Sequence, residues 1–142
     1  MRAVKVLVDT GPLVAFLNRR DRYHAWAKQQ LVKLKPPLLT CEAVVSEACF
    51  LLRAQPGGAE AVLELLEREL LEITFDLGEE ASRIRDVIAR YANLPASLAD
   101  ACLVRMAELH AGSRVLTLDS HYKIYRIHGR KVIPTISPDE DA

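Results

Sequence analysis

The N-terminal stretch VKVLVDTGPLVAFLN, residues 4–18, constrains the fold more than any other part of the chain. Val4–Val8 is a short and almost uninterrupted apolar run, which predicts a strand buried within a sheet. Pro12 is tolerated in a first helical turn, so Leu13–Leu17 is predicted to continue as a helix. Between the two apolar segments lies Asp9, a carboxylate that is costly to bury without a partner. The stretch therefore predicts a strand that leads directly into a helix, with an unexplained charge at the junction.

The rest of the chain repeats this alternation of short apolar strands with helices. Further strands are expected at Leu38–Thr40, Leu71–Phe75, Arg114–Leu118 and Lys131–Pro134. Further helices are expected at Arg22–Lys35, from a Thr40 cap to about Ala54, at Ala59–Leu70, at Glu79–Tyr91 and at Ser97–Ala111. Strands that alternate with helices or helix pairs indicate a layered α/β fold with a mostly parallel sheet. We expect a single domain over residues 1–142, with a solvated acidic tail at about 137–142.

Composition narrows the class of protein. Half of the 142 residues are hydrophobic, which excludes a disordered chain, and Lys+Arg and Asp+Glu both number 19, so net charge does not argue for or against a nucleic-acid partner. The charges are uneven, however, because the stretch 60–86 is mainly acidic and the stretch 114–131 mainly basic, which permits a basic patch for a polyanion. Three widely spaced cysteines fit neither a disulfide framework nor a zinc site. Without a signal peptide or a membrane-spanning run, the expected location is cytoplasmic.

Two of the predicted strands end in the same way. VLVD ends on Asp9 with Thr10 beside it, and VLTLD ends on Asp119 with Thr117 two residues earlier. In open α/β sheets, ligands bind outside the carboxyl ends of the strands, so these two carboxylates are candidates for one site. The alternative is that each Asp only caps the turn or helix that follows it.

Two more acids lie on predicted helices. Glu47 lies at the margin of the apolar stripe of its helix, next to Val44 and Leu51, although it could also be an ordinary exposed edge residue. Asp100 lies on a helix that is apolar almost all round, where an unpaired charge is strongly disfavoured. The alternative for Asp100 is a capping box with Ser97 at the start of the helix.

If these four acids converge, they repel one another unless they are protonated or bridged by cations. An oxygen-only site rich in carboxylates suits Mg²⁺ or Mn²⁺ rather than zinc. Two such ions can stabilise both oxygens of a phosphodiester displacement. We therefore expect raised carboxylate pKa values without metal, and a fold that metal stabilises.

At these residues the sequence resembles the PIN-domain ribonucleases, and most of all the toxins of VapBC toxin–antitoxin pairs. The segments that match are VDTGPLVAFL, SEACFLL, LADACLVRMAE and VLTLDSHY, in the order of the family and within a span from about Val4 to Ile136. The resemblance implies a three-layer α/β/α sandwich with a mostly parallel central sheet and an acidic pocket. It also implies metal-dependent hydrolysis of RNA by an endoribonuclease.

Residue by residue, the resemblance implies roles in one site. The metal would be held by Asp9, Asp100 and Asp119, and Glu47 would bind it directly or through water. Supporting roles fall on Thr10, Thr117 and Asn93. Some members carry another acid just after the last Asp, where this chain has Ser120 and His121, and we expect His121 to lie unused on the surface rather than to touch a phosphate.

The partners follow from the same resemblance and from the charge pattern. An RNA substrate could be tracked by Lys123, Arg126 and Arg130. An antitoxin would bury its C-terminal segment in the acidic groove, placing an Arg or Lys against the carboxylates. The family usually forms homodimers, and the Leu-rich helices between Val44 and Leu71 offer apolar faces for one.

Two other classes of protein also place an acid near the end of their first strand. A haloacid-dehalogenase phosphatase needs a second acid two residues after its first Asp, where this chain has Gly11. A response-regulator receiver needs an acidic pair near its first strand, and RAVKVLVD has none. Two alternatives stay open: a PIN-like domain that binds RNA or protein without cleaving it, and a PIN nuclease that is not a toxin.

Overall fold

The computed structural model describes residues 4–140, and the fold is built on a five-stranded sheet in which all paired strands are parallel. The strands are β1 (Val6–Val8), β2 (Leu38–Thr40), β3 (Leu71–Ile73), β4 (Arg114–Leu116) and β7 (Thr135–Ile136), in the spatial order β3-β2-β1-β4-β7. The chain passes from β1 to β2 and β3 on one side, and then to β4 and β7 on the other. The strand order therefore reverses between β1 and β4, which is where open α/β sheets bind ligands.

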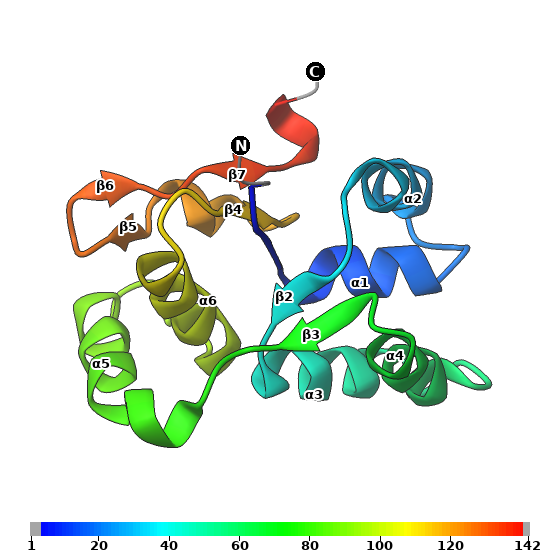
Figure 1. Cartoon of the computed structure of the whole chain (residues 1–142), viewed down its shortest axis with the longest axis horizontal. Helices are drawn as coiled ribbons and strands as arrows, with labels where there is room; N and C mark the ends of the chain where they lie inside the picture. The colour runs from blue at the N-terminus through cyan, green and yellow to red at the C-terminus, as the bar shows by residue number, and fades with distance from the viewer. Residues whose placement is uncertain (1–3, 141–142) are drawn as a thin grey trace.

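Helices cover both faces of this sheet. They are α1 (Thr10–Leu17), α2 (His24–Lys33), α3 (Glu42–Leu51), α4 (Gly58–Glu67), α5 (Leu77–Arg90) and α6 (Leu98–Leu109). In Figure 1, α5 and α6 lie together on one side of the sheet and α1, α2 and α4 on the other, and α3 packs against α1 and α4. The predicted α/β/α sandwich with a mostly parallel sheet is confirmed. Over residues 4–140, no helix is long and apolar enough to cross a membrane.

Two elements next to the site contribute much of the core. All three residues of β1 are buried, as the VLV run predicts for a strand covered on both faces. Helix α6 buries seven residues, in agreement with its nearly all-round apolar sequence. A smaller apolar cluster of Val45, Ala48, Leu52 and Val62 joins α3 to α4. The site described below is thus anchored on two well-buried elements, β1 and α6.

The start of α3 differs from the prediction that Thr40 caps it. Thr40 is buried as the last residue of β2, and its hydroxyl donates a hydrogen bond to the carbonyl oxygen of Val8 at 3.1 Å. Cys41 occupies the N-cap position and makes no side-chain capping bond. The helix also ends at Leu51, before the predicted Ala54, because the chain turns there toward α4.

The predicted last strand, Lys131–Pro134, is wrong as a member of the main sheet. Lys131–Val132 forms β6, which pairs antiparallel with β5 (Arg126–Ile127) in a separate hairpin. His128 and Gly129 have positive φ angles of 52° and 72°, a backbone conformation that reverses the chain and favours glycine. Only after this hairpin does the chain reach the main sheet, as β7.

The predicted solvated tail at 137–142 is only partly correct. Ser137 is buried, and Pro138–Glu140 forms a short 3-10 helix, η2. Asp139 is exposed but forms an ion pair with Lys123 at 3.3 Å. Residues 141 and 142 lie outside the described part of the chain.

Candidate functional site

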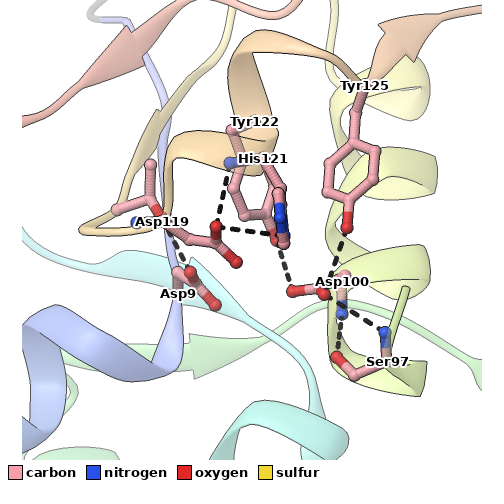
Figure 2. A network of polar contacts seen from close by, with 8 residues as sticks. Asp9, Ser97, Asp100, Asp119, His121, Tyr122 and Tyr125 are labelled. Atoms are coloured by element: carbon pink, nitrogen blue, oxygen red, sulfur yellow. Dashed lines mark hydrogen bonds and ion pairs between the residues drawn. The ribbon is translucent and has the colours of Figure 1, made fainter. Parts of the chain in front are cut away.

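Asp9 and Asp119 lie just beyond the carboxyl ends of β1 and β4, at the point where the strand order reverses. The backbone N–H of Asp9 donates to the carbonyl oxygen of Leu116 at 3.0 Å, which continues the β1–β4 pairing by one step. This register places Asp9 beside Thr117, although the two residues are 108 positions apart in the sequence. Figure 2 shows the two carboxylates on neighbouring backbone segments, with Asp100 facing them from α6.

Asp9 is the most constrained of these acids. It is only 7% exposed, its Oδ1 accepts a hydrogen bond from the N–H of Thr10 at 2.8 Å, and its Oδ2 accepts one from the Thr117 hydroxyl at 2.7 Å. The pKa of Asp9 is raised to about 7, mainly by burial and to a smaller extent by the charges of Asp100 and Asp119, while its two hydrogen bonds oppose the shift. Asp9 also forms the N-cap of α1, so its capping role is compatible with a place in a buried acidic site.

Thr117 connects the two strand-end acids. Its hydroxyl donates to Asp9 and accepts a hydrogen bond from the backbone N–H of Asp119 at 2.9 Å. Asp119 in turn caps η1 (Ser120–Lys123), accepting from the N–H of His121 at 2.8 Å. The half-exposed His121 ring lies with its Nδ1 3.3 Å from the same carboxylate oxygen, so it contacts Asp119, and its expected lack of a functional role stays a prediction.

Asp100 is held by a capping box and by two tyrosines. Ser97 donates its backbone N–H to Oδ2 of Asp100 at 3.1 Å and accepts the N–H of Asp100 on its hydroxyl at 3.0 Å. The hydroxyls of Tyr122 and Tyr125 donate to Oδ1 and Oδ2 at 3.4 and 3.3 Å. Burial, followed by the charges of the nearby carboxylates, raises the pKa of both phenols, which keeps them protonated at neutral pH.

The two tyrosines are site residues that the sequence interpretation missed. Aromatic residues beside a strand end are ordinarily assigned to the core, and both side chains are indeed fully buried. A signal was nevertheless available, because Asp119, Tyr122 and Tyr125 are spaced three residues apart. In a tight 3-10 turn, residues at this spacing lie on one side, although only Tyr122 of the two tyrosines lies within η1.

Glu47 approaches the other acids from α3 with an exposed side chain. Its pKa is raised, first by partial burial and then by the charge of Asp100, while the hydroxyl of Thr10 opposes the shift. That hydroxyl belongs to a residue that is only 4% exposed, and it makes no hydrogen bond of good geometry. Apart from this contact with Glu47, no partner for the buried hydroxyl is found within residues 4–140, which indicates a place for a further polar ligand.

Comparison with known proteins identifies the fold around these acids. The family model of the PIN domain matches residues 6–128, a stretch that contains all four carboxylates. The chain belongs to the PIN-domain family. Among solved structures, the VapC20 toxin of Mycobacterium tuberculosis, described as cleaving the sarcin–ricin loop, matches with a TM-score of 0.70 and 18% sequence identity. That match covers 78% of this chain and 87% of the toxin, and at this identity it shows a shared fold. No curated protein sequence matches the chain.

Four other residues that the sequence assigned to this PIN domain's site form no hydrogen bond or ion pair with the four acids within residues 4–140. Asn93 is exposed on the turn after α5, and within residues 4–140 no hydrogen bond links it to a carboxylate. Arg126 uses one guanidinium nitrogen to donate to three backbone carbonyls, from Lys123 to Tyr125. Lys123 pairs with Asp139, and Arg130 is exposed. Contacts of the three basic residues with RNA stay predictions.

The donor set of this PIN domain fits a hard divalent cation. Within the described residues, no three His, Cys, Asp or Glu side chains already lie close enough together to hold one ion. However, the charges of Asp100 and Asp119 both act on Asp9, and ionised carboxylates retain acceptor positions beyond the hydrogen bonds that they receive. The unpartnered Thr10 hydroxyl adds one more oxygen. Oxygen donors of this kind are those that Mg²⁺ and Mn²⁺ prefer.

Proposed function

We propose that this PIN domain is a metal-dependent endoribonuclease in which Asp9, Glu47, Asp100 and Asp119 form the catalytic centre. The observation that carries the proposal is the burial of Asp9, with a pKa of about 7, among other acids. Within residues 4–140, no Lys or Arg side chain pairs with any of the four carboxylates. A divalent cation is the partner that such a cluster requires if it is ionised at neutral pH.

In this proposal, Asp9, Asp100 and Asp119 hold one or two Mg²⁺ or Mn²⁺ ions, and Glu47 binds directly or through water. When bound, the cation supplies charge neutralisation and Lewis-acid activation of the phosphodiester. Thr117 orients Asp9 through its hydrogen bond to Oδ2. Glu47 is exposed and has a raised pKa, so its carboxylate is suited to accept the proton of an attacking water.

The favoured substrate is single-stranded or looped RNA, because a phosphodiester reaches an acidic pocket more easily when the backbone is splayed. The similar VapC20 structure is described as a toxin that cleaves the sarcin–ricin loop, which supports this class of substrate. Lys123, Arg126 and Arg130 are proposed to contact the RNA backbone.

The test is cleavage of a mixed RNA pool with Mg²⁺ or Mn²⁺, comparing wild type with Asp9→Asn and Asp100→Asn. Both variants should lose more activity than the ~10–100-fold that loss of a supporting residue causes at metal sites. Asp86→Asn is the matched control, because Asp86 is an exposed acid on α5 that undergoes the same charge change. Metal-independent cleavage, or full activity in both site variants, would contradict the proposal. RNA binding by wild type without cleavage would instead favour the cleavage-inactive alternative.

We further propose that the chain is the toxin of a type II toxin–antitoxin pair acting in the cytoplasm. The partner antitoxin would place a basic side chain against the carboxylates in the acidic groove. A small neighbouring reading frame for a DNA-binding protein, and relief of growth arrest on its co-expression, would support this pairing. If expression of the chain alone does not affect growth, a non-toxin nuclease is favoured.

A homodimer is proposed through the apolar surface of α3 and α4. Phe50, Leu51 and Leu63 are each at least half exposed there, which is unusual for such large apolar side chains in one region. Light scattering at micromolar concentrations should give twice the monomer mass of 15.9 kDa. A monomer throughout that range would count against the dimer.

A further inference from the structure

The carboxylate of Asp100 receives more hydrogen bonds than its place in a capping box requires. Its Oδ2 accepts from the Ser97 N–H and from the Tyr125 hydroxyl, and its Oδ1 accepts from the Tyr122 hydroxyl. Figure 2 shows the two tyrosines reaching Asp100 from the same segment, with Ser97 approaching from the opposite side. Because an ionised carboxylate has about four acceptor positions, Oδ2 is fully used and Oδ1 retains one.

The two phenols are held in place by their neighbours. The ring of Tyr122 packs edge-on against that of Tyr125, with centroids 5.2 Å apart, and Tyr91, the C-cap of α5, also packs edge-on against Tyr125 at 4.9 Å. The hydroxyl of Tyr91 accepts the backbone N–H of Arg126 at 2.8 Å, so this hydroxyl faces away from Asp100 while the ring supports the cluster. The hydroxyls that face Asp100 are therefore positioned by a packed aromatic cluster.

Packing alone does not account for these hydroxyls. Tyr122 and Tyr125 are fully buried, and within the described residues Asp100 is the acceptor for both phenolic O–H groups. Phenylalanine would fill nearly the same volume without the cost of removing a hydroxyl from water. What the two O–H groups add is control over the orientation and the available lone pairs of one carboxylate.

We propose that Tyr122 and Tyr125 are positioning residues that orient Asp100 to bind a divalent cation through the remaining acceptor position of Oδ1. The inference rests on the metal-binding part of the proposed function and adds how one of its ligands is oriented. Residues that hydrogen-bond to a metal ligand fix its direction, and their loss typically costs ~10–100-fold in metal affinity. Asp100 accordingly binds metal through one oxygen and does not chelate it with both.

The test measures Mn²⁺ affinity by electron paramagnetic resonance for wild type, Tyr122→Phe, Tyr125→Phe and the double variant. Each substitution removes one oxygen and keeps the ring, and the double variant should bind Mn²⁺ ~10–100-fold more weakly. Tyr91→Phe is the matched control, because it loses a hydroxyl from the same aromatic cluster that does not touch Asp100. Its Mn²⁺ affinity should stay within about twofold of wild type, against that ~10–100-fold loss.

Melting temperatures with and without Mn²⁺ separate positioning from simple support of the fold. A positioning role predicts that the increase in melting temperature on adding Mn²⁺ shrinks in the Tyr122 and Tyr125 variants but not in Tyr91→Phe. Equal decreases in melting temperature with and without Mn²⁺, or an unchanged Mn²⁺ affinity of the folded double variant, would overturn the proposal. If the double variant does not fold, the two single variants decide the question by the same criteria.

The outcomes also distinguish this inference from the proposed function. A wild-type protein that binds no Mn²⁺ would overturn both. A wild-type protein that binds Mn²⁺ and loses affinity in the tyrosine variants, yet cleaves no RNA, would support the positioning role and reject the nuclease.

Discussion

At the scale of single residues, Asp9 combines the unfavourable burial of an ionised carboxylate with a proposed role in the catalytic centre. Burial disfavours the charged carboxylate and brings its pKa to about 7, well above the ordinary value of 3.8. Hydrogen bonds from Thr10 and Thr117 reduce this cost without removing it. In the metal-free protein, the cost of burying the ionised Asp9 carboxylate is thus only partly offset, and a bound cation would offset it further.

The pH dependence of stability follows from this pKa. Because the pKa of Asp9 is raised from 3.8 to about 7 on folding, the protonated side chain favours the fold below pH 3.8, and this stability is lost as pH rises through about 7. Asp9→Asn lacks this dependence, so at pH 8 the metal-free variant should be more stable than wild type, by at most ~4 kcal/mol.

Urea unfolding of both proteins between pH 4 and pH 8 in the presence of a chelator checks this expectation. The two curves should converge toward the acid end. Parallel curves across the whole range would show that Asp9 ionises as freely in the folded protein as in the unfolded chain. Addition of Mg²⁺ at pH 8 should stabilise wild type more than the variant.

At the scale of elements, three of the four acids of the candidate site lie where helices begin. Asp9 caps α1, Asp119 caps η1, and Asp100 completes the capping box of α6. The first turn of a helix carries unpaired N–H groups and a positive dipole end, both of which favour a carboxylate. Capping and site formation, which were alternatives at the level of sequence, are therefore two consequences of one geometry.

The capping box of α6 gives a prediction at this scale. Ser97→Ala removes the hydroxyl that accepts the N–H of Asp100, so the free energy of unfolding should fall by ~1 kcal/mol. Ser82→Ala, in the exposed interior of α5, is the control and should be neutral or slightly stabilising. Urea denaturation measures both, and equal values for the two variants would mean that the cap contributes nothing.

Several elements could be predicted because their signals are local. The VLV run marks β1, and the Ser97-x-x-Asp100 spacing marks the start of α6. The hairpin of β5 and β6 could not be predicted, because strands of two residues are too short to show an apolar alternation. Thr40 was misassigned as a cap because its hydroxyl has a distant partner, the carbonyl of Val8 on the neighbouring strand.

The acids of the candidate site could be named from the sequence, but the hydrogen bonds that they accept could not be predicted. Four carboxylates out of place in apolar surroundings are visible in the sequence, as is the Thr beside each strand-end Asp. The bond from Thr117 to Asp9 depends on the β1–β4 register, which no local pattern specifies. The bonds of Tyr122 and Tyr125 to Asp100 depend on how η1 packs over α6, so they emerge only from the assembled fold.

At the scale of the whole molecule, topology gathers the acids from distant parts of a neutral chain. The reversal of strand order beside β1 leaves the ends of β1 and β4 next to each other, and α3 and α6 contribute one acid each from either side. The net charge of zero conceals this local concentration of negative charge. The expectation of one domain over 1–142 stays a prediction, alongside a PIN-domain match to residues 6–128.

The central claim is that a divalent cation is the missing partner of these carboxylates, and calorimetric titration with Mn²⁺ tests it most directly. At a roughly physiological pH of about 7.5, wild type should bind Mn²⁺, and Asp9→Asn and Asp100→Asn should each bind it more than ~10-fold more weakly. Asp86→Asn should bind as wild type does. A wild-type protein that shows no saturable Mn²⁺ binding, or site variants that bind as tightly as wild type, would contradict the account.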